Sequence, residues 1–316
     1  MIVTKRETKQ LQGAALRHKS KKEFKLLLYV LPCIALIWIF KYKPLEGWAY
    51  ALYDYKPGYD LADCRYVGLE NFEFLFSNPL MLRQLMNALK NTFGINLLGY
   101  LFSPLPMFFA VFLSEIRSKK FQKLVQTVTS LPNFVSWVIM FSLASSMFGS
   151  NGFINSVLTS LDMDPIPNIL MSSDNVWLTQ VLLQQWKGLG WSAIVYFAAI
   201  AGCDQTIYEA ASVDGANRMQ RIWHITLPQL IPTYFVLLVM HVGHIITTGV
   251  DQYMIFSTPM NMESIETLDL YVYNIGMGSG RLSYAVAVGL MQSVVSIIMF
   301  SITNLASKKI RGTSVF

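Results

Sequence analysis

Charged residues are scarce in this chain. Asp, Glu, Lys and Arg together make up 14% of its 316 residues, whereas a soluble domain averages about 25%. Hydrophobic residues supply 53% of the sequence, and they occur in long runs that few charges interrupt. A soluble domain of this length would show shorter apolar runs, so the composition predicts an integral membrane protein.

Motifs for catalysis and metal binding are also missing. The three cysteines, Cys33, Cys64 and Cys203, have no C-x-x-C spacing, which argues against a disulfide framework or a zinc site. No G-x-x-x-x-G-K-[ST] occurs, so the chain lacks a P-loop for nucleotide phosphates. Neither G-x-S-x-G nor H-E-x-x-H is present. We therefore expect no catalytic residues, no bound metal and no cofactor in this chain.

The formal net charge of +6 raises the question of a nucleic-acid partner. The basic residues do not gather on an aromatic-lined face, as such binding would require. They cluster beside apolar segments instead, which is the pattern that orients membrane proteins. We expect no nucleic-acid partner.

Six apolar segments are candidates to cross the membrane. A bilayer core about 30 Å thick requires roughly 20 helical residues. The segments run approximately over residues 26–39, 91–114, 124–148, 176–202, 234–256 and 284–305. The first is short, but Lys41 and Lys43 can extend it by snorkelling. Pro104 and Pro106 predict a kink or break in the second, and the stretch 187–190 is expected to interrupt the fourth.

The distribution of Lys and Arg predicts the orientation of these spans. The tail 1–25 carries eight such residues, and basic residues recur after the second span, after the fourth span and at the C-terminal end. The alternate connections are poorer: residues 46–88 of the first carry three, the second has none and the third has one, Arg281. Basic connections stay in the cytoplasm, so both termini and the connection 203–230 are expected there. Residues 46–88 are expected outside.

The polar segment Glu209–Pro232, EAASVDGANRMQRIWHITLPQLIP, lies between the fourth and fifth spans. We expect helices over 207–213 and 217–225, separated at Asp214 and Gly215, because glycine tolerates positive φ. Asp214 is expected to accept backbone N–H groups of the second helix. Pro228 and Pro232 are expected to redirect the chain into the membrane.

This segment allows two interpretations from its residues alone. Its apolar side chains can fill a groove on a partner protein, or the pair of helices can lie on the membrane surface without a partner. The apolar side chains concerned are Val213, Ala216, Met219, Ile222 and Trp223.

The same segment resembles the EAA loop of permease subunits in bacterial binding-protein-dependent ABC importers. Further stretches, 67–72, 126–132 and 186–191, resemble the oligosaccharide and polysaccharide branch of that family. Ile222 departs from the pattern, because many members have Phe there. The resemblance implies that the loop docks on a separate ATPase subunit through Glu209, Ala210, Ala211, Asp214, Gly215, Ala216, Met219, Ile222, Ile225, Leu227 and Pro228.

Polar residues within the predicted spans are candidates for a substrate pathway, because ionisable groups at membrane depth are costly. Lys187 either lines the path and meets a polar or anionic sugar, or snorkels at the outer half of its helix. His241 and His244 lie three residues apart on one helix face; an interhelical hydrogen bond is favoured over a pathway role. The remaining candidates are Asn96, Tyr100, Gln184, Gln185, Asp251 and Gln252.

The resemblance implies an all-α membrane protein with six spans, a MetI-like permease core and both termini cytoplasmic, in the bacterial cytoplasmic (inner) membrane. We expect residues 1–25 to form a basic cytoplasmic tail and residues 26–316 a single permease domain. The implied partners are a second homologous permease, two ATPase subunits that bind ATP and Mg, an extracytoplasmic solute-binding protein and a carbohydrate substrate, with membrane lipid around the spans. The alternative is an ion-coupled secondary transporter without an ATPase, which would need coupling carboxylates or inverted repeats; only Asp251 lies inside a predicted span.

Overall fold

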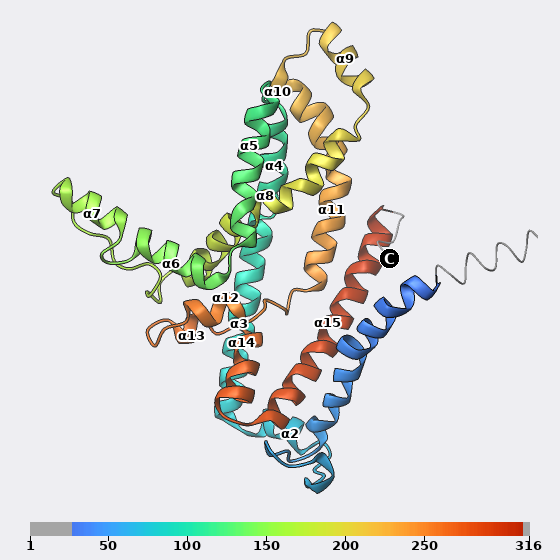
Figure 1. Cartoon of the computed structure of the whole chain (residues 1–316), viewed down its shortest axis with the longest axis vertical. Helices are drawn as coiled ribbons and strands as arrows, with labels where there is room; N and C mark the ends of the chain where they lie inside the picture. The colour runs from blue at the N-terminus through green and yellow to red at the C-terminus, as the bar shows by residue number, and fades with distance from the viewer. Residues whose placement is uncertain (1–26, 312–316) are drawn as a thin grey trace, which may run out of the picture.

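The computed structural model describes residues 27–311, and this part of the chain is helical apart from its connections. It contains no β-strand, only an isolated bridge between Tyr53 and Tyr66. Figure 1 shows an elongated bundle whose two ends carry α9 and α10 on one side and α2 on the other. The predicted all-α architecture is confirmed within these residues. The predicted tail 1–25 lies outside them.

The first helix is longer than the sequence suggested. It runs from Leu27 to Leu52, with a π-helical turn η1 (Trp38–Tyr42) and a 3-10 segment η2 (Lys43–Leu52) at its end. The helix packs against α15 (Leu282–Arg311) through η2 (Figure 1). The short turn η3 (Leu61–Asp63) and helix α2 (Glu70–Ser77) complete this end of the molecule.

The second predicted span is part of a long helical rod. Helix α3 (Pro79–Phe102) begins at Asn78, whose side chain accepts the N–H groups of Leu80 and Met81. A short turn separates α3 from α4 (Leu105–Ser114), and this turn contains Pro104. The prolines predict a kink or break here, and the structure has a break between α3 and α4. The rod reaches much further toward α2 than residue 91, where the sequence placed its start.

The third predicted span, 124–148, is wrong as a single helix. Helix α5 (Lys119–Ser130) ends in the 3-10 turn η4 (Leu131–Phe134), which contains Pro132. The chain then changes direction into α6 (Trp137–Phe148) and α7 (Phe153–Ser160), and Figure 1 shows these two helices leaving the bundle sideways. Proline removes a backbone donor and fixes φ, so α5 cannot continue through this point.

Helix α8 (Val176–Ala201) is continuous over 26 residues, so the predicted interruption at 187–190 is wrong. Gly190 serves close packing instead: a Cβ built there would lie 2.4 Å from the backbone carbonyl of Thr129 in α5. The two helices therefore touch through their backbones. Helix α8 also packs against α3 and α4.

The fifth predicted span ends early. Helix α11 (Leu227–Gly243) stops thirteen residues before 256, and an irregular stretch leads to α12 (Asp251–Phe256). The short helices α13 (Met262–Ile265) and α14 (Leu268–Tyr273) and the π-helical turn η6 (Asn274–Gly278) then lead into α15, which contains the sixth predicted span.

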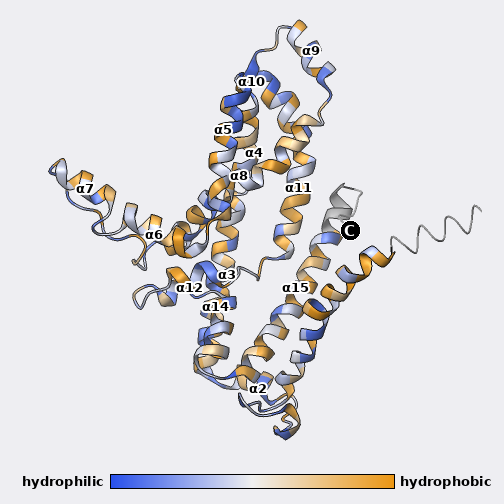
Figure 2. Cartoon of the chain, in the orientation of Figure 1, coloured by the Kyte–Doolittle hydropathy of each residue, from blue (hydrophilic) through white to orange (hydrophobic). Residues whose placement is uncertain are grey.

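Five helices of the described residues are long and apolar enough to cross a membrane by length and composition: Leu27–Leu52, Pro79–Ser114, Trp137–Ser160, Arg218–Gly243 and Leu282–Leu305. Helix α8, the fourth predicted span, is not among them. Figure 2 shows hydrophilic residues gathered on α10 and on the adjacent end of α5, away from the apolar middle of the bundle.

Candidate translocation cavity and coupling segment

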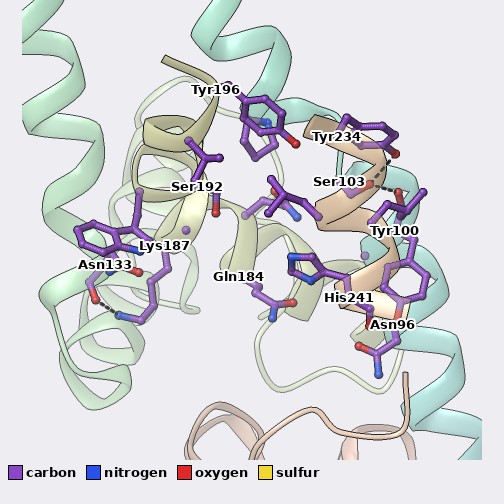
Figure 3. A pocket seen from close by; sticks show the side chains of 18 of the residues that line it. Asn96, Tyr100, Ser103, Asn133, Gln184, Lys187, Ser192, Tyr196, Tyr234 and His241 are labelled. Atoms are coloured by element: carbon purple, nitrogen blue, oxygen red, sulfur yellow. Dashed lines mark hydrogen bonds between the residues drawn. The ribbon is translucent and has the colours of Figure 1, made fainter. Parts of the chain in front are cut away.

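A cavity of about 500 Å³ lies among α3, α8, α11 and the turn η4. Figure 3 shows polar and aromatic side chains converging on it from these elements. Six of the nine pathway candidates from the sequence line it: Asn96, Tyr100, Gln184, Gln185, Lys187 and His241. They come from three helices that are far apart in the chain, so the fold brings them together.

Several lining side chains hold α3 against α11. The Asn96 amide donates to the Ile245 carbonyl at 2.7 Å, and the Tyr100 hydroxyl donates to the His241 carbonyl at 2.9 Å. The hydroxyls of Ser103 and Tyr234 share a hydrogen bond of 2.9 Å. The first two bonds lie where α11 ends, and the third joins the end of α3 to the middle of α11.

Other lining groups remain open to a ligand. Within the described part of the chain, the amides of Gln184 and Gln185 and the imidazole of His241 have no hydrogen-bond partner. Figure 3 shows Gln184 and His241 projecting into the space between α8 and α11. None of the residues that line the cavity is an Asp or Glu. The cavity therefore offers amide, hydroxyl, imidazole and aromatic groups without a negative charge.

Lys187 has a role that neither interpretation from the sequence included. Its ammonium donates hydrogen bonds to the backbone carbonyls of Pro132, Asn133 and Val135, at the turn between α5 and α6 (Figure 3). The same group lies 5.3 Å from the ring centroid of Trp137, within the range of a cation–π contact. Lys187 thus holds the carbonyls of the turn that links α5 to α6.

Replacing Lys187 with Met is expected to destabilise this turn. Three carbonyls would lose a charged donor, at a cost of about 1–3 kcal/mol of unfolding free energy. The midpoint of thermal unfolding of the purified protein measures the effect. Lys187→Arg keeps a cationic donor and is the matched control. The contrary outcome is a Lys187→Met protein that keeps normal stability and neutral-sugar transport but loses the transport of acidic sugars. That outcome would contradict the structural role and favour a pathway role.

The remaining three pathway candidates lie elsewhere. His244 follows α11, and its Nδ1 lies 2.9 Å from the Met240 carbonyl. Asp251 is exposed at the start of α12. Gln252 is 5% exposed, and its amide donates to both the backbone and the side-chain oxygen of Gln180. These residues do not line the cavity.

The sequence reasoning missed Asp269, which organises the irregular stretch after α11. One of its carboxylate oxygens accepts the N–H groups of Thr248 and Gly249, both at 2.7 Å, and the other accepts the Gln292 amide at 2.7 Å. The residue falls outside the predicted spans, so the search for ionisable groups in apolar runs passed over it. Among the cavity residues, Ser192 was missed although it follows Gln184 and Gly188 at four-residue spacing, which is a helical stripe.

The segment between α8 and α11 forms two short helices, as predicted. Helix α9 (Gln205–Val213) ends at Asp214, and Gly215 has φ +80°. The predicted cap is wrong, however: Asn217 caps α10 (Arg218–Arg221) in a reciprocal pair of hydrogen bonds with Gln220. Asp214 instead closes the preceding helix.

The predicted redirection at the prolines is also wrong. Helix α10 continues through a π-helical turn η5 (Ile222–Thr226) directly into α11. Pro228 is the second residue of α11, directly after the π-helical turn, and Pro232 lies inside that helix. Residues Arg218–Gly243 therefore form one helical rod.

Burial divides the predicted coupling residues into two groups. Val213, Met219 and Trp223 are 88%, 52% and 55% exposed. Ile222 and Leu227 are 4% and 7% exposed and pack in the core with residues of α4 and α8. The expectation that Ile222 fills a groove on a partner is therefore wrong; it anchors the segment to the bundle. The exposed face also includes Glu209, Ala210, Asp214 and Gly215, while Ala211, Ala216 and Ile225 are partly covered.

Side-chain bonds tie α9 to the rod. The hydroxyls of Tyr208 and Thr226 are 3.0 Å apart, and the Arg221 guanidinium donates to the Ser212 hydroxyl at 2.9 Å. Asp204 starts α9 by accepting hydrogen bonds from the backbone N–H and the hydroxyl of Thr206, which lower the pKa of its carboxyl. These contacts make α9 and α10 one unit, which we call the coupling hairpin (residues 204–226).

The chain that contains this cavity and the coupling hairpin is similar to several known proteins. Residues 103–312, more than half of the chain, match the family described as binding-protein-dependent transport system inner membrane component. The chain is 36% identical over 300 residues to Protein LplB of Bacillus subtilis (strain 168), covering 94% of this chain and 92% of that protein. It is also 36% identical to the polygalacturonan/rhamnogalacturonan transport system permease protein YteP of the same organism, covering 90% and 88%.

The structure is similar to a chain in a crystal structure of a bacterial ABC transporter involved in the import of the acidic polysaccharide alginate. The TM-score is 0.80 with 32% sequence identity, and the match covers 94% of this chain and 99% of the other. A second structure, of a bacterial alginate ABC transporter in complex with an alginate pentasaccharide-bound periplasmic protein, matches with the same TM-score and identity.

Proposed function

This chain belongs to the family of binding-protein-dependent transport system inner membrane components, and we propose that it forms half of the path by which an acidic oligosaccharide enters the cell. It is a permease subunit of an ABC importer, a non-catalytic membrane component whose ATP is hydrolysed by partner subunits. Family membership decides against the ion-coupled secondary transporter.

The cavity is the observation that carries this proposal. Amides, hydroxyls and aromatic rings from α3, α8 and α11 surround about 500 Å³, and such groups suit the hydroxyls and apolar faces of sugar rings. Because Asp and Glu are absent from the lining, the cavity holds no carboxylate that would repel a substrate bearing carboxylates. The names of YteP and of the structural neighbours, which concern polygalacturonan and alginate, support the same class.

The proposed assembly follows from the two ends of the molecule. A second homologous permease would complete the pathway, and two ATPase subunits, which bind ATP and Mg, would dock on the coupling hairpin and its counterpart. A substrate-loaded binding protein would dock on the opposite side, at residues 46–88 and 257–283. The structural neighbour in complex with a periplasmic protein supports this arrangement. ATP-driven closure of the ATPases would move the hairpin, and the rod that includes α11 would transmit the movement to His241.

The test is ATP hydrolysis by the assembled complex in nanodiscs. A binding protein loaded with an oligogalacturonate is expected to stimulate hydrolysis several-fold more than one loaded with a neutral oligosaccharide of equal length. His241→Leu removes an open polar group from the cavity and is expected to lower substrate uptake roughly ten-fold, about the worth of one hydrogen bond to a charged group. His244→Leu, three residues away and outside the cavity, is the matched control.

Two outcomes would count against the proposal. If only neutral sugars stimulate ATP hydrolysis, the proposed acidic substrate is wrong, but the importer function stands. Equal loss of uptake in the His241 and His244 variants would show that this cavity is not the pathway.

A further inference from the structure

A second cavity, of about 540 Å³, lies at the cytoplasmic end of the bundle, beneath the coupling hairpin. One wall is the α5 stripe Lys119, Gln122, Lys123 and Gln126, and the other includes Tyr208, Arg221 and Thr226 of the hairpin. The end of α8 contributes Phe197 and Ile200. The cavity therefore joins the fixed bundle to the hairpin that is proposed to receive the ATPase.

This cavity is separate from the proposed sugar pathway. Successive residues of an α-helix are rotated by about 100°, which places Phe197 and Ile200 on the side of α8 opposite to Gln184 and Gly188. The first pair lines the cytoplasmic cavity and the second pair lines the translocation cavity. Helix α8 thus stands between the two spaces, and the cytoplasmic cavity needs another occupant.

The charges around the cytoplasmic cavity favour an anion. Lys119, Lys123 and Arg221 line it, against a single acidic residue, Glu115. The guanidinium of Arg221 also donates to the Ser212 hydroxyl at 2.9 Å, which holds it at the wall of the cavity. Its positive charge, with those of the two lysines, attracts an anion.

The outer face of α5 indicates where the anion comes from. Helix α5 turns its polar stripe toward the cavity and leaves Phe121, Leu124 and Val128 between 51% and 59% exposed on the other side. A soluble protein would bury this apolar side, whereas acyl chains would cover it in a membrane. Lysines beside such a face, on the cytoplasmic side, are placed to meet lipid phosphates.

We propose that this cavity binds the phosphate headgroup of an anionic phospholipid from the cytoplasmic leaflet. The headgroup lies between Lys119, Lys123 and Arg221, and its acyl chains follow the apolar face of α5. A bound headgroup bridges α5 and the coupling hairpin, so it stiffens the connection through which the ATPase is proposed to act. The lipid site itself stands independently of the transported substrate; only its effect on ATP hydrolysis rests on the proposed function.

Lipid retention by the complete transporter complex tests the site directly. Native mass spectrometry would follow binding of phosphatidylglycerol and of phosphatidylcholine during titration. Neutralising both lysines, Lys119→Gln with Lys123→Gln, is expected to weaken phosphatidylglycerol binding roughly five-fold per charge and to leave phosphatidylcholine unaffected. Lys120→Gln is the matched control, because Lys120 is exposed on the same helix turn but does not line the cavity. Both lysines in the test variant are exposed, so folding should be unchanged.

A soluble anion is distinguished in a second titration with inorganic phosphate. Phosphate binding that depends on Lys119 and Lys123, without selective phosphatidylglycerol binding, would overturn the lipid source. Equal phosphatidylglycerol binding by the wild type, the double variant and Lys120→Gln would overturn the site. In nanodiscs, ATP hydrolysis stimulated by the binding protein is expected to rise with phosphatidylglycerol content in the wild type and in Lys120→Gln, but not in the double variant.

Discussion

Gly190→Val is expected to disrupt the contact between α5 and α8 and to lower the stability of the folded protein. A Cβ at residue 190 would lie 2.4 Å from the backbone carbon and oxygen of Thr129 and 2.6 Å from the backbone nitrogen of Ser130. These are backbone atoms, so no side-chain rotation relieves the clash. The helices would have to separate, and overpacking in a tight core costs about 1–3 kcal/mol or more, a large part of a typical total stability of about 5–15 kcal/mol.

The loss would reach the cavity as well. The turn η4 follows directly after Ser130, and its carbonyls hold Lys187. The midpoint of thermal unfolding and the yield of folded protein in detergent measure the effect. Gly188→Ala is the matched control, since a Cβ there meets only the Ser192 hydroxyl, at 4.0 Å. Similar behaviour of the two variants would contradict the close α5–α8 packing.

Val213→Asp is expected to prevent the ATPase from binding while leaving the permease folded. Val213 is 88% exposed at the end of α9, so the new carboxylate stays in water in the isolated chain and costs little stability. In the proposed complex the same side chain would enter the ATPase surface. Burial of an unpaired charge at the centre of an interface costs about 2 kcal/mol or more, roughly a thirty-fold weaker association.

Co-purification of the ATPase with the tagged permease measures this association. Met260→Asp is the matched control, because Met260 is also highly exposed, at 77%, but lies between α12 and α13 on the side proposed for the binding protein. Its variant is expected to retain the ATPase. Normal ATPase binding by Val213→Asp would remove this residue from the docking surface and favour the exposed residues of α10, such as Met219.

The sequence predicted helices well where local signals agree. The glycine at 215 and the prolines at 104 and 106 each mark a break between two helices that the structure contains. The predictions from the sequence were wrong where the same residue type can serve two structural purposes. The glycines near Lys187 suggested a loosened helix, but Gly190 permits a close helix contact instead. Likewise, Asp214 and Asn217 are both suitable caps, and only the position of Gln220 selects Asn217.

The candidate site shows a similar division. Polar residues in apolar runs were a sound guide to Asn96, Tyr100, Gln184, Gln185 and His241, which meet at one cavity. The guide could not tell that Gln252 pairs with Gln180 in the core, or that Asp269 holds an irregular stretch. Those partners are 72 and 21 residues away in the chain, and no local pattern joins them.

By itself, the sequence determined the membrane class and the polar coupling segment, because both are local properties. A run of apolar residues is either long enough to cross a bilayer or not, and a connection between two spans is polar by its own residues. The resemblance of that segment indicated the importer family, which comparison with known proteins then confirmed. The tertiary structure alone decided which face of α8 lines the translocation cavity, that Lys187 caps the turn after α5, and that Ile222 is buried while Val213 is exposed. Each of these depends on contacts between helices distant in the chain. Periodicity specifies that a helix has faces, and only packing against its neighbours specifies what each face meets.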